Sequence, residues 1–330
     1  KQKQGQGGTM YLNKFNFFKR LKNKMEGIST KNDLYENRIL IAQALVMRNK
    51  DNVFKSINEA EFKVFSQWGE DGIIQYLINK LPIANKIFIE FGVEDYLESN
   101  TRFLLENNNW SGLILDGSIR HIDKIKNSAL YWKYDLLARN VFITKGNIDG
   151  IIDEYIENSG FNKEIGVLSI DVDGNDYHVW KAIKSIDPVI VICEYNSLFG
   201  NKYKLTVPYD DAFVRSSKHY SNLYFGASIG AICQLAKAKG YEYIGCTNAG
   251  NDAFFVKKDY AERYIKELIT TPHETFFRAK SRESRDVKGN LTYVRRVEDK
   301  VKIIEGMDVI DLEINKKVKI NTLLLGGLEQ

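Results

Sequence analysis

The segment KIFIEFGVEDY, residues 86–96, constrains the fold more than any other part of the chain. Residues 87–91 form a mostly apolar run rich in β-branched and aromatic side chains, and Gly92 ends this run. We therefore predict a buried strand that ends in a tight turn. A carboxylate in a buried strand is costly unless it meets a donor or a cation, so Glu90 requires such a partner. Gly92 allows a ligand to approach the backbone closely.

A second apolar run, residues 110–115, ends at Asp116 and Gly117. In a doubly wound sheet, an acid at the end of the second strand, roughly twenty residues after a glycine turn, binds the ribose of a nucleoside. The spacing therefore predicts a nucleoside-cofactor site. Two ordinary strand ends with solvated acids are the alternative that these two features leave open.

Composition narrows the class of protein. A chain of 330 residues holds one large α/β domain with extensions or two small domains, and we favour one. The net charge of +4 is mild and its basic residues are interspersed with acids, which argues against a nucleic-acid partner. The three cysteines, Cys193, Cys233 and Cys246, form no CxxC pair, which is typical of a reducing compartment. No apolar run has the roughly eighteen residues that span a bilayer, and we predict a cytoplasmic protein without a transmembrane segment.

The N-terminal part of the chain is expected to lie outside the main domain. We predict a disordered leader or tag remnant at 1–9 and a helical extension at 10–60, with one helix over 33–48. The basic, aromatic segment 10–24 is expected to pack on its own domain, with weak contact to a membrane surface as the alternative. A further helix starts near residue 66, with Ser66 as its N-cap. The polar residues Ser66, Gln67, Glu70 and Asp71 line a ligand pocket or form an exposed helix start.

Strands and helices alternate through the middle of the chain. We predict strands at 87–91, 110–115, 141–144, 165–170 and 188–193, helices at 100–105, 122–140, 151–156 and 227–239, and an antiparallel strand pair at 241–246 and 253–256. This alternation indicates a mainly parallel α/β sheet with helices on both faces. Ligands bind such a sheet beyond the carboxyl ends of its strands.

Polar side chains stand at every predicted parallel strand end. They are Glu90, Asp116, Asn147, Asp171, and Glu194 with Asn196. A structural protein has little reason to place so many costly acids along one sheet edge. This convergence is the strongest sign of a ligand site in the residues themselves.

Several sequence blocks carry a family resemblance. FSQWGEDG, FIEFGVEDYLESNTRFL, WSGLILDGS, LSIDVDGNDYHVWKAI, YFGASIGAICQLAKAKGY, SRESRD and GNLTYV resemble, in order and spacing, the FkbM-type branch of class I S-adenosylmethionine-dependent methyltransferases. The resemblance covers roughly residues 65–311. It implies a Rossmann-like, seven-stranded, mostly parallel sheet with an antiparallel last strand. We accordingly predict a methyltransferase domain over 61–270 and a substrate-facing or lid segment over 271–330.

The resemblance also implies which residues bind the cofactor, S-adenosylmethionine. The turn with Glu90, Gly92 and Glu94 faces the methionine and sulfonium part, although EFGVEDY lacks the later glycines of the usual pattern. Asp116 binds the ribose hydroxyls, and Asn147 lies near the adenine. The full expected set is Gln67, Glu90, Gly92, Glu94, Asn100, Asp116, Gly117, Asn147 and Asp171.

The implied reaction is O-methylation of a hydroxyl on a sugar, a glycan or a sugar-derived small molecule. Because an alcohol must lose a proton, a base or a bound cation is required. Asp171 and His178 are the candidate bases, although a helical histidine beside aromatic residues is more often packed than catalytic. Oxygen ligands suit Mg²⁺, Mn²⁺ or Ca²⁺, and the predicted ligands are Asp171, Asp173, Glu194 and Asn196. The alternative is that the two aspartates only accept hydrogen bonds from the backbone and the cofactor.

Acceptor contacts are expected from Tyr195 and from three arginines. Arg278, Arg282 and Arg285 lie close together in the C-terminal segment and match an anionic acceptor such as a sugar phosphate or a uronate. A solvated charge run is the other interpretation of these arginines.

Two other functions fit part of the sequence. The Asp171-Val172-Asp173 motif is also typical of metal-dependent glycosyltransferases, but Glu90 and Asp116 argue against that class. A nicotinamide dehydrogenase is disfavoured because GxGxxG is missing. A non-catalytic scaffold of the same fold is disfavoured because the acids at the strand ends are kept.

Overall fold

The computed structural model describes Thr30 and residues 33–320. The chain separates into two compact units, Lys1–Arg48 and Asn49–Gln330, and each is described by itself. In the first unit, residues 33–48 are helical, as predicted. The segments 1–9 and 10–24, for which we predict a leader and a basic surface helix, lie outside the described residues.

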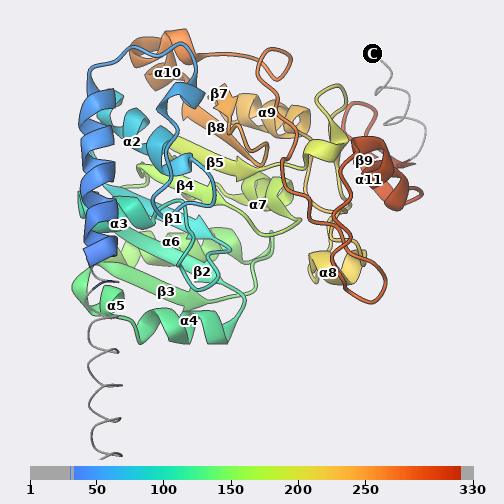
Figure 1. Cartoon of the computed structure of the whole chain (residues 1–330), viewed down its shortest axis with the longest axis horizontal. Coiled ribbons are helices and arrows are strands. Elements are labelled where there is room, and N and C mark those ends of the chain that lie inside the picture. The colour runs from blue at the N-terminus through green and yellow to red at the C-terminus, as the bar shows by residue number, and fades with distance from the viewer. Residues whose placement is uncertain (1–29, 31–32, 321–330) are drawn as a thin grey trace, which may run out of the picture. The chain divides into compact units, whose positions relative to one another are not determined.

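The second unit is built on a seven-stranded sheet. Its strands are β1 (Ile87–Phe91), β2 (Ser111–Asp116), β3 (Leu136–Asn140), β4 (Val167–Ile170), β5 (Ile190–Glu194), β7 (Tyr241–Cys246) and β8 (Asp252–Lys257). Their order across the sheet is β3-β2-β1-β4-β5-β8-β7 (Figure 1). All neighbours are parallel except β8, which runs antiparallel to both β5 and β7. The mostly parallel sheet with an antiparallel last strand is therefore confirmed.

Side-chain alternation along β1 shows how helices cover both faces of the sheet. Ile87, Ile89 and Phe91 belong to the apolar core on the face that is covered by α6 (Ile148–Ser159), α7 (Asp176–Ala182) and α9 (Ile229–Ala238). Phe88 points to the other face, which is covered by η1 (Ile57–Ala60), α2 (Glu70–Lys80), α3 (Arg102–Asn108), α4 (Ile119–Lys126) and α10 (Lys258–Tyr264). Both faces of β1 are thus buried, which explains its nearly continuous apolar sequence.

Two predictions about local structure were wrong in the segment 119–144. The expected helix over 122–140 is two short helices, α4 and α5 (Ala129–Lys133), followed by β3, so the third strand ends where we expected it to begin. Among the described strands β3 lies at the edge of the sheet and pairs with β2, and its first four residues alternate between buried and partly exposed. Arg139 and Asn140 weaken its strand signal, whereas the β-branched residues of the following loop imitate one.

The start of α2 was also predicted wrongly. The helix begins at Glu70 with Gly69 as its N-cap, four residues after Ser66. One carboxylate oxygen of Asp71 instead accepts hydrogen bonds from the backbone amides of Val64, Phe65 and Ser66 and from the Ser66 hydroxyl, each at 2.7 Å. Ser66 therefore belongs to a buried loop that Asp71 holds in place.

A small second sheet lies beyond the large one. It pairs β6 (Leu205–Thr206), β9 (Asp308–Asp311) and β10 (Lys316–Lys319), and it packs with α11 (Val297–Ile303) around a separate apolar core. Figure 1 shows β9, α11 and α8 (Arg215–Lys218) together on the right of the large sheet. The sequence did not predict this sheet. Over the described ranges, no helix combines the length and the apolarity that a bilayer crossing needs.

Candidate functional site

A cavity of about 790 Å³ lies at the carboxyl ends of the parallel strands, which is within the roughly 300–1,000 Å³ typical of small-molecule sites. It is lined by residues that follow β1, β2, β3, β4 and β5, by the loop before β8, and by the C-terminal segment. Among the described residues the lining is strongly acidic, and its lysine or arginine side chains are those of Arg215 and Lys300. Its carboxylates are Glu90, Glu94, Glu98, Asp116, Asp171, Asp173, Glu194, Asp252 and Glu283.

Gly92 lies where the sheet order reverses between β1 and β4. Its φ of 71° lies in the left-handed region, and a Cβ atom here would come within 1.8 Å of the carbonyl oxygen of Asp171. The Gly92 amide donates to the Leu115 carbonyl at 2.9 Å, which ties the turn to β2. Only glycine therefore lets the ends of β1, β2 and β4 close up beneath the cavity.

Glu90 finds the donors that its burial requires. Its side chain is 5% exposed, and its carboxylate accepts hydrogen bonds from the Ser99 hydroxyl (2.6 Å), the Asn100 amide (2.8 Å) and the Thr101 amide (3.1 Å). Burial raises the pKa of Glu90, and these hydrogen bonds oppose that rise. The carboxylate thus fixes the loop 99–101 and with it Asn100, which lines the cavity beside Glu90.

Asp116 occupies the end of β2 and organises the neighbouring turns. Its two carboxylate oxygens accept from the Glu94 amide (2.8 Å) and the Ser118 amide (2.7 Å), and His121 Nδ1 lies 3.2 Å away. Gly117 and Phe142 line the cavity next to it, and Glu94 does so from a left-handed turn with φ of 47°. Because all these groups meet at one strand end, this part of the cavity combines a carboxylate with an aromatic ring.

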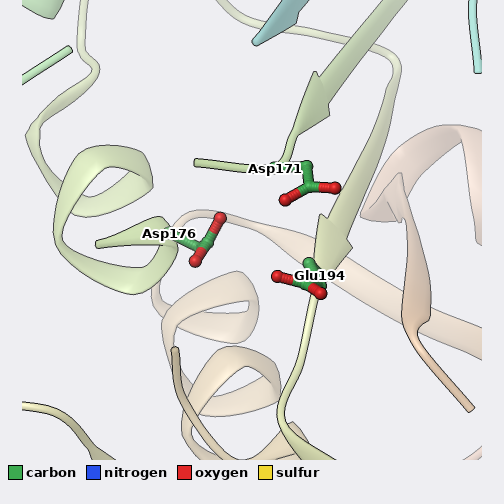
Figure 2. Close-up of side chains that lie close together, drawn as sticks. All are labelled: Asp171, Asp176 and Glu194. Carbon is green, nitrogen blue, oxygen red and sulfur yellow. The ribbon is translucent and has the colours of Figure 1, made fainter. Parts of the chain in front are cut away.

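Three acids converge between β4, β5 and α7. Asp171, Asp176 and Glu194 each offer a carboxylate oxygen, and these oxygens lie within 4.8 Å of one another (Figure 2). Burial, followed by mutual repulsion between carboxylates, raises the pKa of Asp171 and of Glu194 well above the ordinary range. The pKa of Asp176 rises to about 6 because of burial, although the amides of Val172 and Gly174 donate to it. Oε2 of Glu194 has no hydrogen-bond partner in the described part of the chain, so the cluster holds a buried acceptor in need of a proton or a cation.

The structure places Asp173 and Asn196, two of the four predicted metal ligands, outside this cluster. The side chain of Asp173 is 65% exposed and pairs with Arg215 at 2.8 Å. The side-chain amide of Asn196 forms hydrogen bonds within the protein. It donates to the carbonyls of Leu223 and Phe225, and its oxygen accepts from the Leu198 amide. Asp176, which we did not predict, takes the third position beside Asp171 and Glu194.

His178, the second predicted base, is not among the cavity-lining residues. It packs between the rings of Tyr177 and Tyr209, and its Nε2 lies 2.9 Å from the Val207 carbonyl. Burial lowers its pKa. Its position is that of a packed histidine, so a catalytic role has no support in the geometry.

Asn147, the residue expected near the adenine, is also outside the cavity. It is the N-cap of α6, and its side chain accepts from the Thr144 amide (2.8 Å) and donates to the Phe142 carbonyl (3.0 Å). The misplaced third strand explains this error, since residues 141–143 reach the cavity instead.

The three arginines expected to bind the acceptor do not line the cavity. Arg278 donates to the Ser197 carbonyl, Arg282 lies over the ring of Tyr293, and Arg285 contacts the Gly289 carbonyl and Glu283. They hold the C-terminal segment together. Arg215 and Lys300 supply the positive charge at the cavity instead.

The other two predicted site residues, Gln67 and Tyr195, do line the cavity. Tyr195 is buried and its hydroxyl donates to the Phe277 carbonyl at 2.7 Å, so it anchors the C-terminal segment. Asp252, opposite Glu194 in the register of β5 and β8, is a further buried acid that the sequence reasoning missed. Burial and the nearby carboxylates of Glu70 and Asp171 raise its pKa well above the ordinary range.

Comparisons with known proteins give structural likeness only. No family model and no curated protein matches the chain. Among solved structures, the N-terminal domain of EvdMO1 with SAH bound is similar, with 11% identity and a TM-score of 0.38 over 65% of this chain and 95% of that one. The same domain in the presence of SAH and D-fucose is similar with 10% identity and a TM-score of 0.36, over 65% of this chain and 95% of that one. An S-adenosylmethionine-dependent methyltransferase from Clostridium acetobutylicum ATCC 824 is similar with 9% identity and a TM-score of 0.34, over 57% of this chain and 90% of that one. Such low identities and TM-scores establish neither a family nor a function.

Proposed function

We propose that the protein is an S-adenosylmethionine-dependent O-methyltransferase of the class I, FkbM-type group. The observation that carries this proposal is one cavity that joins the Gly92 turn, the Asp116 carboxylate at the end of β2, and the acid cluster at the ends of β4 and β5. A nucleoside-bearing donor fits the first two features, because ligands of such sheets lie across the switch point with the ribose at the second strand. The acid cluster then faces the acceptor.

The residues present fit this cofactor. Asp116 is proposed to bind the ribose hydroxyls, and Gly117 and Phe142 to bind the adenine. Gly92, Glu94 and Asn100 are proposed to bind the methionine part, where the missing Cβ of Gly92 leaves the backbone accessible. The bound cofactor supplies an electrophilic methyl group. The protein has to position the acceptor for in-line attack and to exclude water.

Asp171 is the proposed proton acceptor for the hydroxyl when the acid cluster holds no cation. It lies at the end of β4 and lines the cavity, and its pKa is raised by burial, then by Asp173 and Asp176. A raised pKa suits a carboxylate to proton transfer near neutral pH. We propose a hydroxyl of a sugar, a glycan or a sugar-derived small molecule as the acceptor.

The glycosyltransferase alternative loses its main support. It requires both acids of Asp171-Val172-Asp173 at one metal and nucleotide site, whereas Asp173 is exposed and paired with Arg215. Calorimetry of the whole chain with S-adenosylhomocysteine, UDP-glucose and NAD⁺ tests the proposal. We expect binding of S-adenosylhomocysteine alone, in the micromolar range or tighter, and binding of either other ligand in its place would refute a methyltransferase.

We further propose that Asp171, Asp176 and Glu194 hold a divalent cation such as Mg²⁺ or Mn²⁺. Three carboxylates this close cannot all ionise without a counter-charge, and hard cations prefer oxygen ligands. Glu194 is the best position to test, because its free Oε2 means that glutamine fits without breaking a hydrogen bond. We expect Glu194→Gln to weaken Mn²⁺ binding at least about tenfold, measured by calorimetry with S-adenosylhomocysteine present.

Asp173→Asn is the matched control, since Asp173 lies beside the cluster but outside it. This variant should bind Mn²⁺ like the unmodified protein. Absence of Mn²⁺ binding in the unmodified protein would rule out the cation. Equal binding in Glu194→Gln would rule out this set of ligands.

A further inference from the structure

Lys300 is a buried cation at the cavity. It lies on α11, is 6% exposed, and lines the cavity next to Ser281. Its Nζ atom donates to the Ser281 carbonyl at 2.8 Å. An ammonium carries three donors, so this single carbonyl leaves most of its hydrogen-bonding capacity for another partner.

Lys300 also has no counter-ion among the residues that the structure describes. Within the part of the chain that the structure describes, no carboxylate comes within ion-pair distance of Nζ, whereas the other cation at the cavity, Arg215, is paired with Asp173 at 2.8 Å. Burial lowers the pKa of Lys300, with no carboxylate raising it. Lysine is almost never this buried unless it is paired, and the uncompensated charge is costly.

The position of Lys300 matches the acceptor side of the cavity. Val301, the residue after Lys300, shares an apolar core with Leu198 and Phe199, which follow β5. Lys300 therefore lies on the β5 side. The carboxyl end of β5 is three strand spacings from that of β2, or about 14 Å at roughly 4.8 Å per spacing. The ribose carboxylate and Lys300 thus belong to different parts of the cavity.

We propose that Lys300 binds an anionic group of the acceptor, a carboxylate or a phosphoryl group. This inference rests on the proposed methyltransferase function and narrows its substrate class to acidic sugars. Arg278, Arg282 and Arg285 contact other protein groups and do not line the cavity. Lys300 is therefore the residue proposed to bind the negative charge of the acceptor. Because the charged lining is otherwise acidic apart from Arg215, which Asp173 neutralises, an unpaired Lys300 also fixes the orientation of the acceptor, with its anionic group on the α11 side.

The test is calorimetry on the full chain saturated with S-adenosylhomocysteine, using D-glucose, D-glucuronate and D-glucose 6-phosphate as probes. We expect one of the two anionic sugars to bind at least about tenfold more tightly than glucose, as charge-assisted hydrogen bonds allow. The better of the two identifies the anion as a carboxylate or a phosphoryl group. In Lys300→Met this preference for the anionic sugar should disappear.

Lys302→Met is the matched control, because Lys302 lies on the same helix and is exposed. It should keep the preference for the anionic sugar. Binding of S-adenosylhomocysteine is measured first in each protein, which shows that the variants are folded and separates failure of the proposed function from failure of this inference. If the unmodified protein binds S-adenosylhomocysteine but prefers neither anionic sugar to glucose, or if Lys300→Met keeps the preference, Lys300 is not the anion site.

Discussion

Asp116→Ala is expected to reduce the affinity for S-adenosylhomocysteine about 100-fold. Each hydrogen bond from a ribose hydroxyl to this carboxylate contributes about 1.5–3 kcal/mol, and the loss of about 3 kcal/mol corresponds to two orders of magnitude. The substitution also removes the acceptor for the Glu94 and Ser118 amides, so the turns that flank the proposed cofactor site loosen. Calorimetry with S-adenosylhomocysteine measures the effect directly.

Asp149→Ala separates the loss of hydrogen bonds to the ribose from the loss of an acceptor for backbone amides. Asp149 also accepts two backbone amides, from Lys184 (2.6 Å) and Ser185 (2.8 Å), but it does not line the cavity. The two variants should lose similar stability in urea, about 1–3 kcal/mol, for the amides left without an acceptor. Only Asp116→Ala should lose cofactor affinity, and comparable losses in both would mean that Asp116 acts through the fold alone.

Gly92→Ala is expected to lower the free energy of unfolding by about 2–5 kcal/mol. The left-handed backbone costs an L-residue about 1–2 kcal/mol, and the overlap of Cβ with the Asp171 carbonyl adds the cost of overpacking. Relief of that overlap requires β1 and β4 to separate at the switch point, so the variant should also bind S-adenosylhomocysteine poorly. Urea unfolding followed by circular dichroism gives the first quantity.

Gly150→Ala is expected to change the free energy of unfolding in the opposite direction. Gly150 lies inside α6, is exposed, and has no atom within 4 Å of an added Cβ. Alanine there should stabilise the protein by about 0.5–1 kcal/mol, because it restricts the unfolded chain and favours the helix. A Gly92→Ala protein as stable as the unmodified one would contradict the strained turn.

The central strands could be predicted because burial on both faces leaves a strong apolar signal. Ile87–Phe91 matches β1 residue for residue, and the acids at the ends of β1, β2, β4 and β5 do line one cavity. The parallel arrangement, in which carboxyl ends share one edge, is what turns scattered sequence positions into neighbours. The pattern at 241–246 and 253–256 predicted an antiparallel pair, and the family resemblance added that the sheet has seven strands with the last one antiparallel.

Side-chain direction in the DVDGND loop could not be predicted. Asp171, Asp173 and Asp176 are equivalent by composition, but Asp173 adopts φ of 54° and directs its carboxylate to Arg215. Asp176 begins α7 and faces inward instead. Three acids within six residues do not reveal which two share a site until the turn conformation is known.

The two cations at the cavity, Arg215 and Lys300, could not be predicted because long-range packing places them there. Arg215 lies in a short helix with no periodic pattern, and Lys300 is one of several lysines in a charged C-terminal segment. Arg215 pairs with Asp173, which lies 42 residues earlier, and Lys300 contacts Ser281, which lies 19 residues earlier. The arginines that look conspicuous in the sequence serve to hold that segment, which local composition cannot distinguish from ligand binding.

The reversed direction of β8 has a consequence for how a methyltransferase of the proposed kind can diversify. Because β8 leads away from the cavity, the chain after it must return across the end of the sheet, where Ala279 bonds to Ser197 and Lys280 to Ala249. The residues proposed to hold the donor all precede β8, whereas Lys300 comes on this returning segment. New acceptors are therefore accessible through changes to the last sixty residues or so, while the donor half of the chain stays as it is.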